Sequence, residues 1–214
     1  MLQNFAQNTY LQKCLFPFLF QIGRTARTDT DYSLKNQGLN MCGFAGIFAG
    51  HRQSESKGAF ELLLEKMGKT LNHRGPDGND IWADRAAGIG LSHRRLAILD
   101  LSSSGSQPMS SACGRYVMVY NGEIYNFSKV RSVLEKEGTV FKGTSDSEVL
   151  VESISRWGMA KSLEQFNGMF AFAIWDRKKR ELIFARDRIG KKPLYYGWAG
   201  NSFVFASSFD RFFW

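Results

Sequence analysis

The sequence predicts an α+β fold in which mainly antiparallel sheets are covered by helices. Strand-like segments come in two groups, four before residue 121 and four after residue 168, and three helical segments lie together between them. Grouped strands and helices are typical of antiparallel sheets, whereas parallel sheets need regular alternation. The chain of 214 residues is long enough to bury a sizeable core in one domain.

The first group begins at Gly43–Phe48, which has the short apolar pattern of a buried strand. The next segment has apolar residues at helical spacing, and these are Phe60, Leu63, Leu64, Met67 and Leu71. Proline and glycine in His73–Gly78 end that helix in a turn. Further strands are predicted at Gly88–Leu91, Leu96–Leu99 and Val117–Tyr120, and Asn121-Gly122 after them is a turn dipeptide.

Three helices are predicted in the middle of the chain. The first covers Phe127–Glu137 and is closed by Gly138. The second starts at Ser145–Glu148, which matches the capping box S-x-x-E, and ends at Trp157-Gly158. A shorter helix follows at 160–166. The last third of the chain is rich in strands, which are predicted at Met169–Trp175, Leu182–Ala185, Leu194–Tyr196 and Phe203–Ala206.

Composition and charge exclude several classes of protein. The hydrophobic fraction of 43% and the charged fraction of 22% are ordinary globular values, which excludes disordered, collagenous and fibrous chains. The net charge is +8, but the densest basic stretch, Arg177–Arg180, lies where a hairpin turn is expected, so it predicts a solvated turn and not a nucleic-acid site. The longest apolar run, Cys14–Phe20, is too short to cross a membrane.

Familiar catalytic and cofactor sites are missing from the sequence. Its three histidines and three cysteines show no metal-ligand spacing, so no metal site is predicted, and the cysteines suggest a reducing cytoplasm. The chain also contains no phosphate-binding loop of the form G-x-x-x-x-G-K-[ST], no G-x-G-x-x-G fingerprint and no G-x-S-x-G elbow.

Residues 1–41 differ from the rest of the chain, because their apolar residues show no sustained helical or alternating period. The apolar stretch after Lys13 is short and interrupted by proline, which disfavours a signal peptide. We interpret this segment as a leader, a propeptide or a mis-assigned upstream segment.

Six short blocks stand in order along the remaining chain. Together they resemble the glutaminase domain of the class II glutamine amidotransferases, which are N-terminal-nucleophile hydrolases, and the sixth block indicates the asparagine-synthetase type. The resemblance covers residues 42–207, with an atypical, truncated tail at 208–214. The blocks are Met41–Phe48, His73–Asp77, Ser92–Ile98, Tyr120–Asn126, Thr144–Glu148 and Arg186–Tyr196.

The resemblance implies a four-layer αββα sandwich of two mainly antiparallel sheets and an enzyme that hydrolyses glutamine. Cys42 corresponds to the nucleophile, whose thioester with the glutamyl group would release ammonia and then glutamate. An N-terminal cysteine can carry its own base, because a thiol and an α-amine have similar pKa values of about 8.5 and 8. Asn121 and Gly122 correspond to the oxyanion pair, although the same dipeptide also suits a simple turn.

The resemblance also assigns the substrate contacts. Arg95 would pair with the α-carboxylate of glutamine, and Glu123 and Asp146 would hold its α-ammonium. From the residues alone, Arg95 also reads as a surface arginine beside Arg94, and Asp146 as a charge that suits a helix start. The pocket would be lined by Leu96, Ile98 and Leu99.

Two features of this chain depart from the family. Residues 1–41 precede Cys42, so the chain as written lacks the free α-amine; we hypothesise that translation begins at Met41 or that a propeptide is removed. The S-G-G-x-D-S loop of the synthetase domain is also missing, so ATP, Mg²⁺ and aspartate would bind only a separate synthetase domain or chain, and a truncated or frame-shifted gene is one origin of the tail. A non-catalytic remnant and the glutaminase half of another class II amidotransferase remain alternatives.

Overall fold

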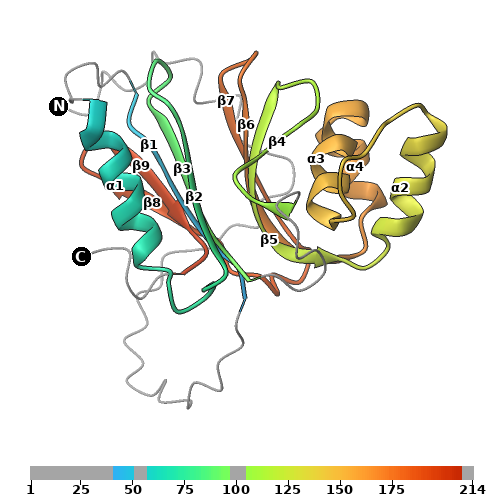
Figure 1. Ribbon diagram of the computed structural model, residues 1–214, viewed down its shortest axis with the longest axis horizontal. Coiled ribbons are helices and arrows are strands. Elements are labelled where there is room, and N and C mark those ends of the chain that lie inside the picture. The colour runs from blue at the N-terminus through green and yellow to red at the C-terminus, as the bar shows by residue number, and fades with distance from the viewer. Residues whose placement is uncertain (1–40, 51–56, 97–104, 209–214) are drawn as a thin grey trace. The chain divides into compact units, whose positions relative to one another are not determined.

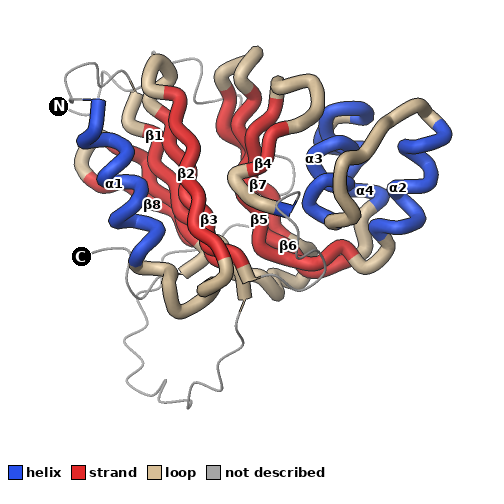
Figure 2. The backbone as a smooth tube through the Cα atoms, viewed as in Figure 1, coloured by secondary structure: helices blue, strands red, loops and turns tan. Residues whose placement is uncertain are grey.

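The computed structural model describes residues 41–50, 57–96 and 105–208, all within one compact unit that spans Asn40–Trp214. In this described part nine strands form two antiparallel sheets, and four helices accompany them (Figures 1 and 2). The predicted leader falls outside these residues except for Met41, and so does the predicted tail except for Ser208.

The first sheet has five strands in the order β2-β3-β1-β9-β8, and the second has four in the order β4-β5-β6-β7. The first sheet consists of β1 (Gly43–Phe48), β2 (Gly78–Asp84), β3 (Ile89–Arg95), β8 (Tyr195–Ala199) and β9 (Ser202–Ala206). The second consists of β4 (Met109–Ser110), β5 (Tyr116–Ile124), β6 (Gly168–Asp176) and β7 (Glu181–Arg186). The helices are α1 (Lys57–Lys69), α2 (Phe127–Lys136), α3 (Asp146–Trp157) and α4 (Met159–Gln165).

Three hydrophobic clusters separate four layers. One lies between α1 and the first sheet, one between the two sheets, and one between the second sheet and helices α2 to α4. Figure 1 shows this order, with α1 outside one sheet and the other helices outside the second. The four-layer αββα sandwich is therefore confirmed.

Alternation along β1 explains how this strand joins two of the layers. Ala45 and Ile47 pack toward α1, whereas Phe44 and Phe48 pack between the sheets. A Cβ atom at Gly46 would lie 2.1 Å from the ring of Phe205, so only glycine leaves room for that aromatic side chain.

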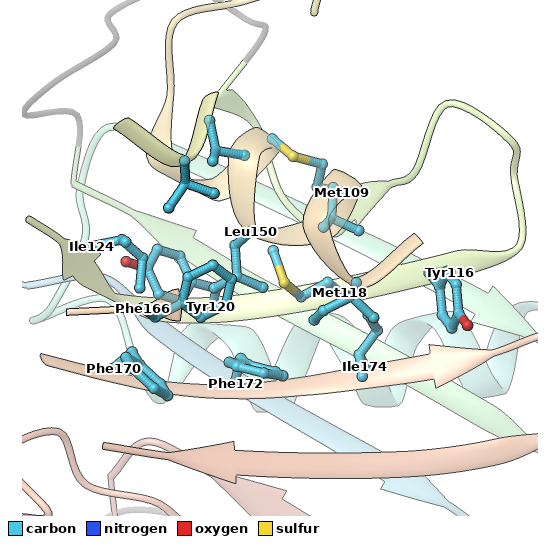
Figure 3. Close-up of a cluster of buried hydrophobic side chains, with 14 of the residues drawn as sticks. Met109, Tyr116, Met118, Tyr120, Ile124, Leu150, Phe166, Phe170, Phe172 and Ile174 are labelled. Carbon is cyan, nitrogen blue, oxygen red and sulfur yellow. The ribbon is translucent and has the colours of Figure 1, made fainter. Parts of the chain in front are cut away.

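The same alternation in β5 divides its side chains between two cores. Met118, Tyr120 and Ile124 pack against the helices, as Figure 3 shows. Val117 and Val119 point the other way, into the layer between the sheets. Since side chains alternate along a strand, Asn121 continues the face of Val117 and Val119.

The predicted helices are confirmed, but the capping box is only half formed. The Ser145 hydroxyl accepts a hydrogen bond from the Glu148 N–H at 3.3 Å. The Glu148 carboxylate does not return to Ser145; instead it accepts from the N–H groups of Lys142 at 2.7 Å and Gly143 at 2.8 Å. It thereby fixes the loop that enters α3.

Three local predictions need correction. Asn121-Gly122 is not a turn, because both residues lie inside β5 and face Ala171 and Phe170 of β6. Strands β2 and β4 were not predicted: β2 has the exposed polar residues Asn79 and Asp80 and gains its place by pairing with β3, and β4 has only two residues. The strand predicted at 88–91 is β3, which extends to Arg95, and Leu96 of the strand predicted at 96–99 lies outside any strand; residues 97–99 lie outside the described part.

Candidate active site

Cys42 lies directly before β1, at one end of the layer between the sheets. The Leu96 N–H donates to its Sγ atom at 3.3 Å, and the thiol donates to the Leu96 carbonyl at 3.5 Å. The pairing of Gly43 with Arg94 in the neighbouring strand explains this contact, because it carries the end of β3 past the cysteine. Two predicted site residues, Cys42 and Leu96, are thus brought together.

The surroundings of Cys42 favour its neutral thiol. Burial raises the pKa of this thiol, and the charge of Asp146 raises it further, while the Leu96 N–H and the charge of Arg95 lower it. Burial is the largest of these effects, so the net pKa is raised. A thiol in this position needs a base before it can act as a nucleophile.

The His73–Asp77 block contacts the backbone of Arg95. The Asp77 N–H donates to the Arg95 carbonyl at 3.0 Å. A Cβ atom at Gly75 would lie 2.6 Å from the carbonyl carbon of Arg95, so glycine is required for this close approach. The block that carries the resemblance therefore shapes the end of β3 on which Arg95 stands.

Asn121 and Gly122 lie in β5 of the second sheet, where Asn121 continues the face that points into the layer between the sheets. Asn121 is buried, and its Nδ2 atom has no hydrogen-bond partner among the described residues. A Cβ atom at Gly122 would lie 2.4 Å from the Met169 carbonyl oxygen, which excludes any side chain there. An unsatisfied buried amide is costly, so Asn121 carries a donor that suits a bound acceptor.

His93 links the two halves of this site. Its Nε2–H donates to the Tyr120 carbonyl at 3.2 Å and so joins β3 to β5 beside Arg95 and Asn121. Burial lowers the pKa of His93 to about 4, and the charge of Arg95 lowers it too, although the hydrogen bond to Tyr120 opposes them. The imidazole is therefore neutral at physiological pH and acts here as a structural donor.

Asp146, the first residue of α3, is a buried carboxylate that already has protein donors. The Tyr120 hydroxyl donates to its Oδ2 atom at 2.7 Å, and the Ile124 N–H donates to the same atom at 3.0 Å. Burial raises the pKa of Asp146, and the hydrogen bonds from Tyr120 and Ile124 partly offset this. The carboxylate is close enough to Cys42 to raise the pKa of its thiol.

The remaining predicted site residues are Glu123, Ile98 and Leu99. Glu123 is partly exposed on β5, and its charge acts on Lys192. Ile98 and Leu99 lie outside the described residues.

The described part holds no group of three or more His, Cys, Asp or Glu side chains able to bind a metal ion. None of its helices has the length and apolar character that a membrane crossing requires.

Two residues near Cys42 were missed by the sequence reasoning. Lys192 is buried and its ammonium contacts Met41 Sδ at 2.8 Å. Arg74 donates from Nη1 to the Ser207 carbonyl at 2.9 Å, and its Nε atom is buried without a partner in the described part. Both belong to blocks that carry the resemblance, but their spacing alone does not distinguish them from their neighbours.

Comparisons with known proteins agree with this arrangement. Residues 41–213 match the family model described as "Glutamine amidotransferase domain". The glutamine-hydrolyzing asparagine synthetases 3 and 1 of Bacillus subtilis (strain 168) are each 38% identical, over 169 and 167 residues, and each alignment covers 78% of this chain and 26% of the relative. The chain thus spans about a quarter of the length of these relatives.

A solved structure has the same fold. The glutamine phosphoribosylpyrophosphate amidotransferase from B. subtilis, solved in complex with ADP and GMP, superposes with a TM-score of 0.63 at 25% sequence identity. The superposition covers 78% of this chain and 42% of that one.

Proposed function

Because this chain belongs to the family of glutamine amidotransferase domains, we propose that it hydrolyses glutamine to glutamate and ammonia through Cys42. The observation that carries the proposal is the buried Nδ2 atom of Asn121, which has no partner among the described residues and lies on the face of β5 that points between the sheets. A developing oxyanion is the acceptor that such a donor suits.

The reaction begins with the free α-amine of Cys42, which takes the proton of the thiol. The thiolate attacks the side-chain amide carbon of glutamine, and the resulting oxyanion accepts hydrogen bonds from Asn121 Nδ2 and the Gly122 N–H. The α-ammonium of Cys42 returns its proton to the leaving nitrogen as this intermediate collapses, so that the C–N bond breaks, ammonia is released and a γ-glutamyl thioester remains on Cys42. Attack by water on the thioester then gives glutamate and restores the thiol.

Charged residues around Cys42 select the amino-acid end of glutamine. Arg95, at the end of β3, would bind the α-carboxylate, and Asp146 with Glu123 would bind the α-ammonium. The Leu96 backbone beside the thiol would line the pocket together with Ile98 and Leu99. For Asp146 the bonds from Tyr120 and Ile124 fix the orientation of the carboxylate in advance.

The mechanism requires that Cys42 become the first residue. With Met41 attached the residue has no free α-amine, and the raised pKa of its thiol leaves it in need of a base. The family match begins at residue 41, which supports a start at Met41 followed by loss of that methionine, or removal of residues 1–41 as a propeptide.

We further propose that the ammonia serves asparagine synthesis. The relatives named above are glutamine-hydrolyzing asparagine synthetases that are about four times longer than the matched region, since it covers 26% of them. A separate synthetase domain or chain would bind ATP, Mg²⁺ and aspartate, and the glutaminase chemistry here would use no cofactor. The glutaminase half of another amidotransferase is the second candidate, which the likeness to the phosphoribosylpyrophosphate enzyme favours.

The full chain provides the test, with the recognition sequence of a protease inserted directly before Cys42 so that the cut leaves Cys42 as the first residue. Glutamate release is measured before and after cleavage. We expect hydrolysis only after cleavage, and none for the same chain carrying Cys42→Ala. Equal activity before cleavage, or none afterwards, would refute the proposal, and the second result would favour a non-catalytic remnant.

A further inference from the structure

The turn after β7 holds Lys192 by both of its backbone groups. The Asp187 carboxylate accepts hydrogen bonds from the N–H groups of Phe170 at 3.1 Å, Lys191 at 2.8 Å and Lys192 at 3.0 Å. Arg186 donates to the carbonyl oxygens of Gly190 and Lys192, at 2.6 Å each. The position of Lys192 is therefore fixed by a network and does not depend on its own side chain.

This turn brings a buried ammonium to Met41, the residue directly before Cys42. Lys192 is only 5% exposed, and its Nζ atom donates to Met41 Sδ at 2.8 Å. A thioether is a weak acceptor, and within the described residues Lys192 takes part in no ion pair. A buried cation with so little compensation is destabilising, which indicates that its charge serves the neighbouring site.

Four charged or titratable groups act on this ammonium. Burial lowers the pKa of Lys192 and the charge of Arg74 lowers it further, whereas Cys42, Glu123 and Asp187 raise it. Cys42 is therefore within electrostatic range of the Lys192 ammonium.

Met41 is bonded directly to the nitrogen of Cys42, so its loss changes the surroundings of both residues. The ammonium loses its thioether acceptor at the same step that creates the α-amine. The side chain of Met41 thus occupies, before removal, a place beside Lys192 that the mature site leaves to Cys42 or to solvent.

We propose that Lys192 is a positioning residue for the nucleophile, whose positive charge keeps the released α-amine of Cys42 in its neutral form and favours the thiolate. A nearby cation disfavours a second ammonium and stabilises an anion, so one charge promotes both halves of the proton transfer from thiol to amine. The inference rests on the proposed function, since it assumes that Cys42 becomes N-terminal.

The test uses the full chain with the cleavable segment, after Cys42 has been released. Lys192→Met removes the charge at similar volume, Lys192→Arg keeps it, and Lys191→Met is the matched control because Lys191 is exposed next door. Two profiles are measured between pH 5 and pH 10: the rate of Cys42 alkylation by iodoacetamide, and kcat for glutamine hydrolysis. Thermal unfolding shows that each variant is folded, and Lys192→Gln replaces the Met variant if that one is not.

We expect Lys192→Met to shift both profiles toward higher pH by about one unit and to lower kcat near neutral pH about tenfold. Lys192→Arg and Lys191→Met should keep the wild-type profiles. Unshifted profiles in a folded Lys192→Met chain would overturn the inference, and so would a rise in KM with unchanged kcat, which would assign the ammonium to substrate binding. A wild-type chain without hydrolysis would instead refute the proposed function, while the alkylation profile would still test Lys192.

Discussion

The layer between the two sheets has an apolar region and a polar end that differ in what they contribute. The apolar region is built from side chains such as Phe44, Val119 and Trp175, which are at most 1% exposed. The polar end is formed by Cys42, whose thiol pKa is raised, by Asn121 with its unpartnered Nδ2 atom, and by the Lys192 ammonium beside Met41. Packing thus holds the sheets together, and the proposed chemistry belongs to the end where β1 begins.

The largest effect we predict is at the polar end. Cys42→Ala should lower glutamine hydrolysis by the released chain by at least roughly 10³-fold, because the nucleophile is lost. Cys113→Ala is the matched control, since this cysteine is exposed. Steady-state glutamate release measures both. Comparable activity of the two variants would remove Cys42 from the mechanism.

The apolar region should respond in the opposite way. Trp175→Ala removes a side chain that is 1% exposed, so we expect the free energy of unfolding to fall by about 3–5 kcal/mol. Trp175 pairs with Val117, four residues along β5 from Asn121, so the activity per folded molecule should change little. Urea unfolding and glutamate release on the same samples measure the two quantities. A large loss of activity in the folded fraction would contradict the division into two regions.

Asn121 tests the contrast between the apolar region and the polar end at a single residue. Asn121→Ala should lower kcat about 10²–10³-fold by removing the oxyanion donor. Since Nδ2 has no partner among the described residues, the free energy of unfolding should fall by only about 1 kcal/mol. Kinetics and urea unfolding of this variant provide the measurement. Strong destabilisation without a fall in kcat would make Asn121 a structural residue.

The last prediction is a pH dependence of stability that we assign to His93, whose imidazole joins β3 to β5. Its pKa of about 4 in the folded protein lies below the ordinary value of 6.5, so the folded state binds this proton less readily than the unfolded chain. The stabilisation is fully present above about pH 6.5 and is lost as the pH falls toward 4, on the order of 3 kcal/mol in total.

His93→Gln keeps an amide that can donate to the Tyr120 carbonyl but does not titrate. The free energy of unfolding of this variant should therefore depend less on pH between 6.5 and 4 than that of the wild type. Unfolding in urea at several pH values compares the two. Parallel curves across this interval would show that His93 does not carry the effect.

The sequence predicts most of the helices and strands, but it fails for segments whose conformation depends on pairing with a strand distant in the chain. Asn121-Gly122 has the composition of a hairpin turn, yet β6 pairs along its whole length and keeps both residues extended. Strand β2 has too few apolar residues to be recognised without its partner β3. Local pattern cannot reveal such pairings, because they depend on residues distant in the chain.

The site shows the same limit. The family resemblance was enough to nominate Cys42, Arg95 and Asp146, because the blocks occur together and in order along the chain. Lys192 was overlooked, since only the fold brings it 151 residues back along the chain to Met41. The roles assigned to Arg95, Glu123 and Asp146 in glutamine binding stay predictions.

The most direct test of the account is to trap the nucleophile. The released chain is treated with a diazoketone analogue of glutamine, and the covalent adduct is located by mass spectrometry of the intact protein and its peptides. We predict a single adduct on Cys42, blocked by excess glutamine and absent from the uncleaved chain. Labelling of Cys113 instead, or equal labelling of the uncleaved chain, would contradict the claim that an N-terminal Cys42 performs the chemistry.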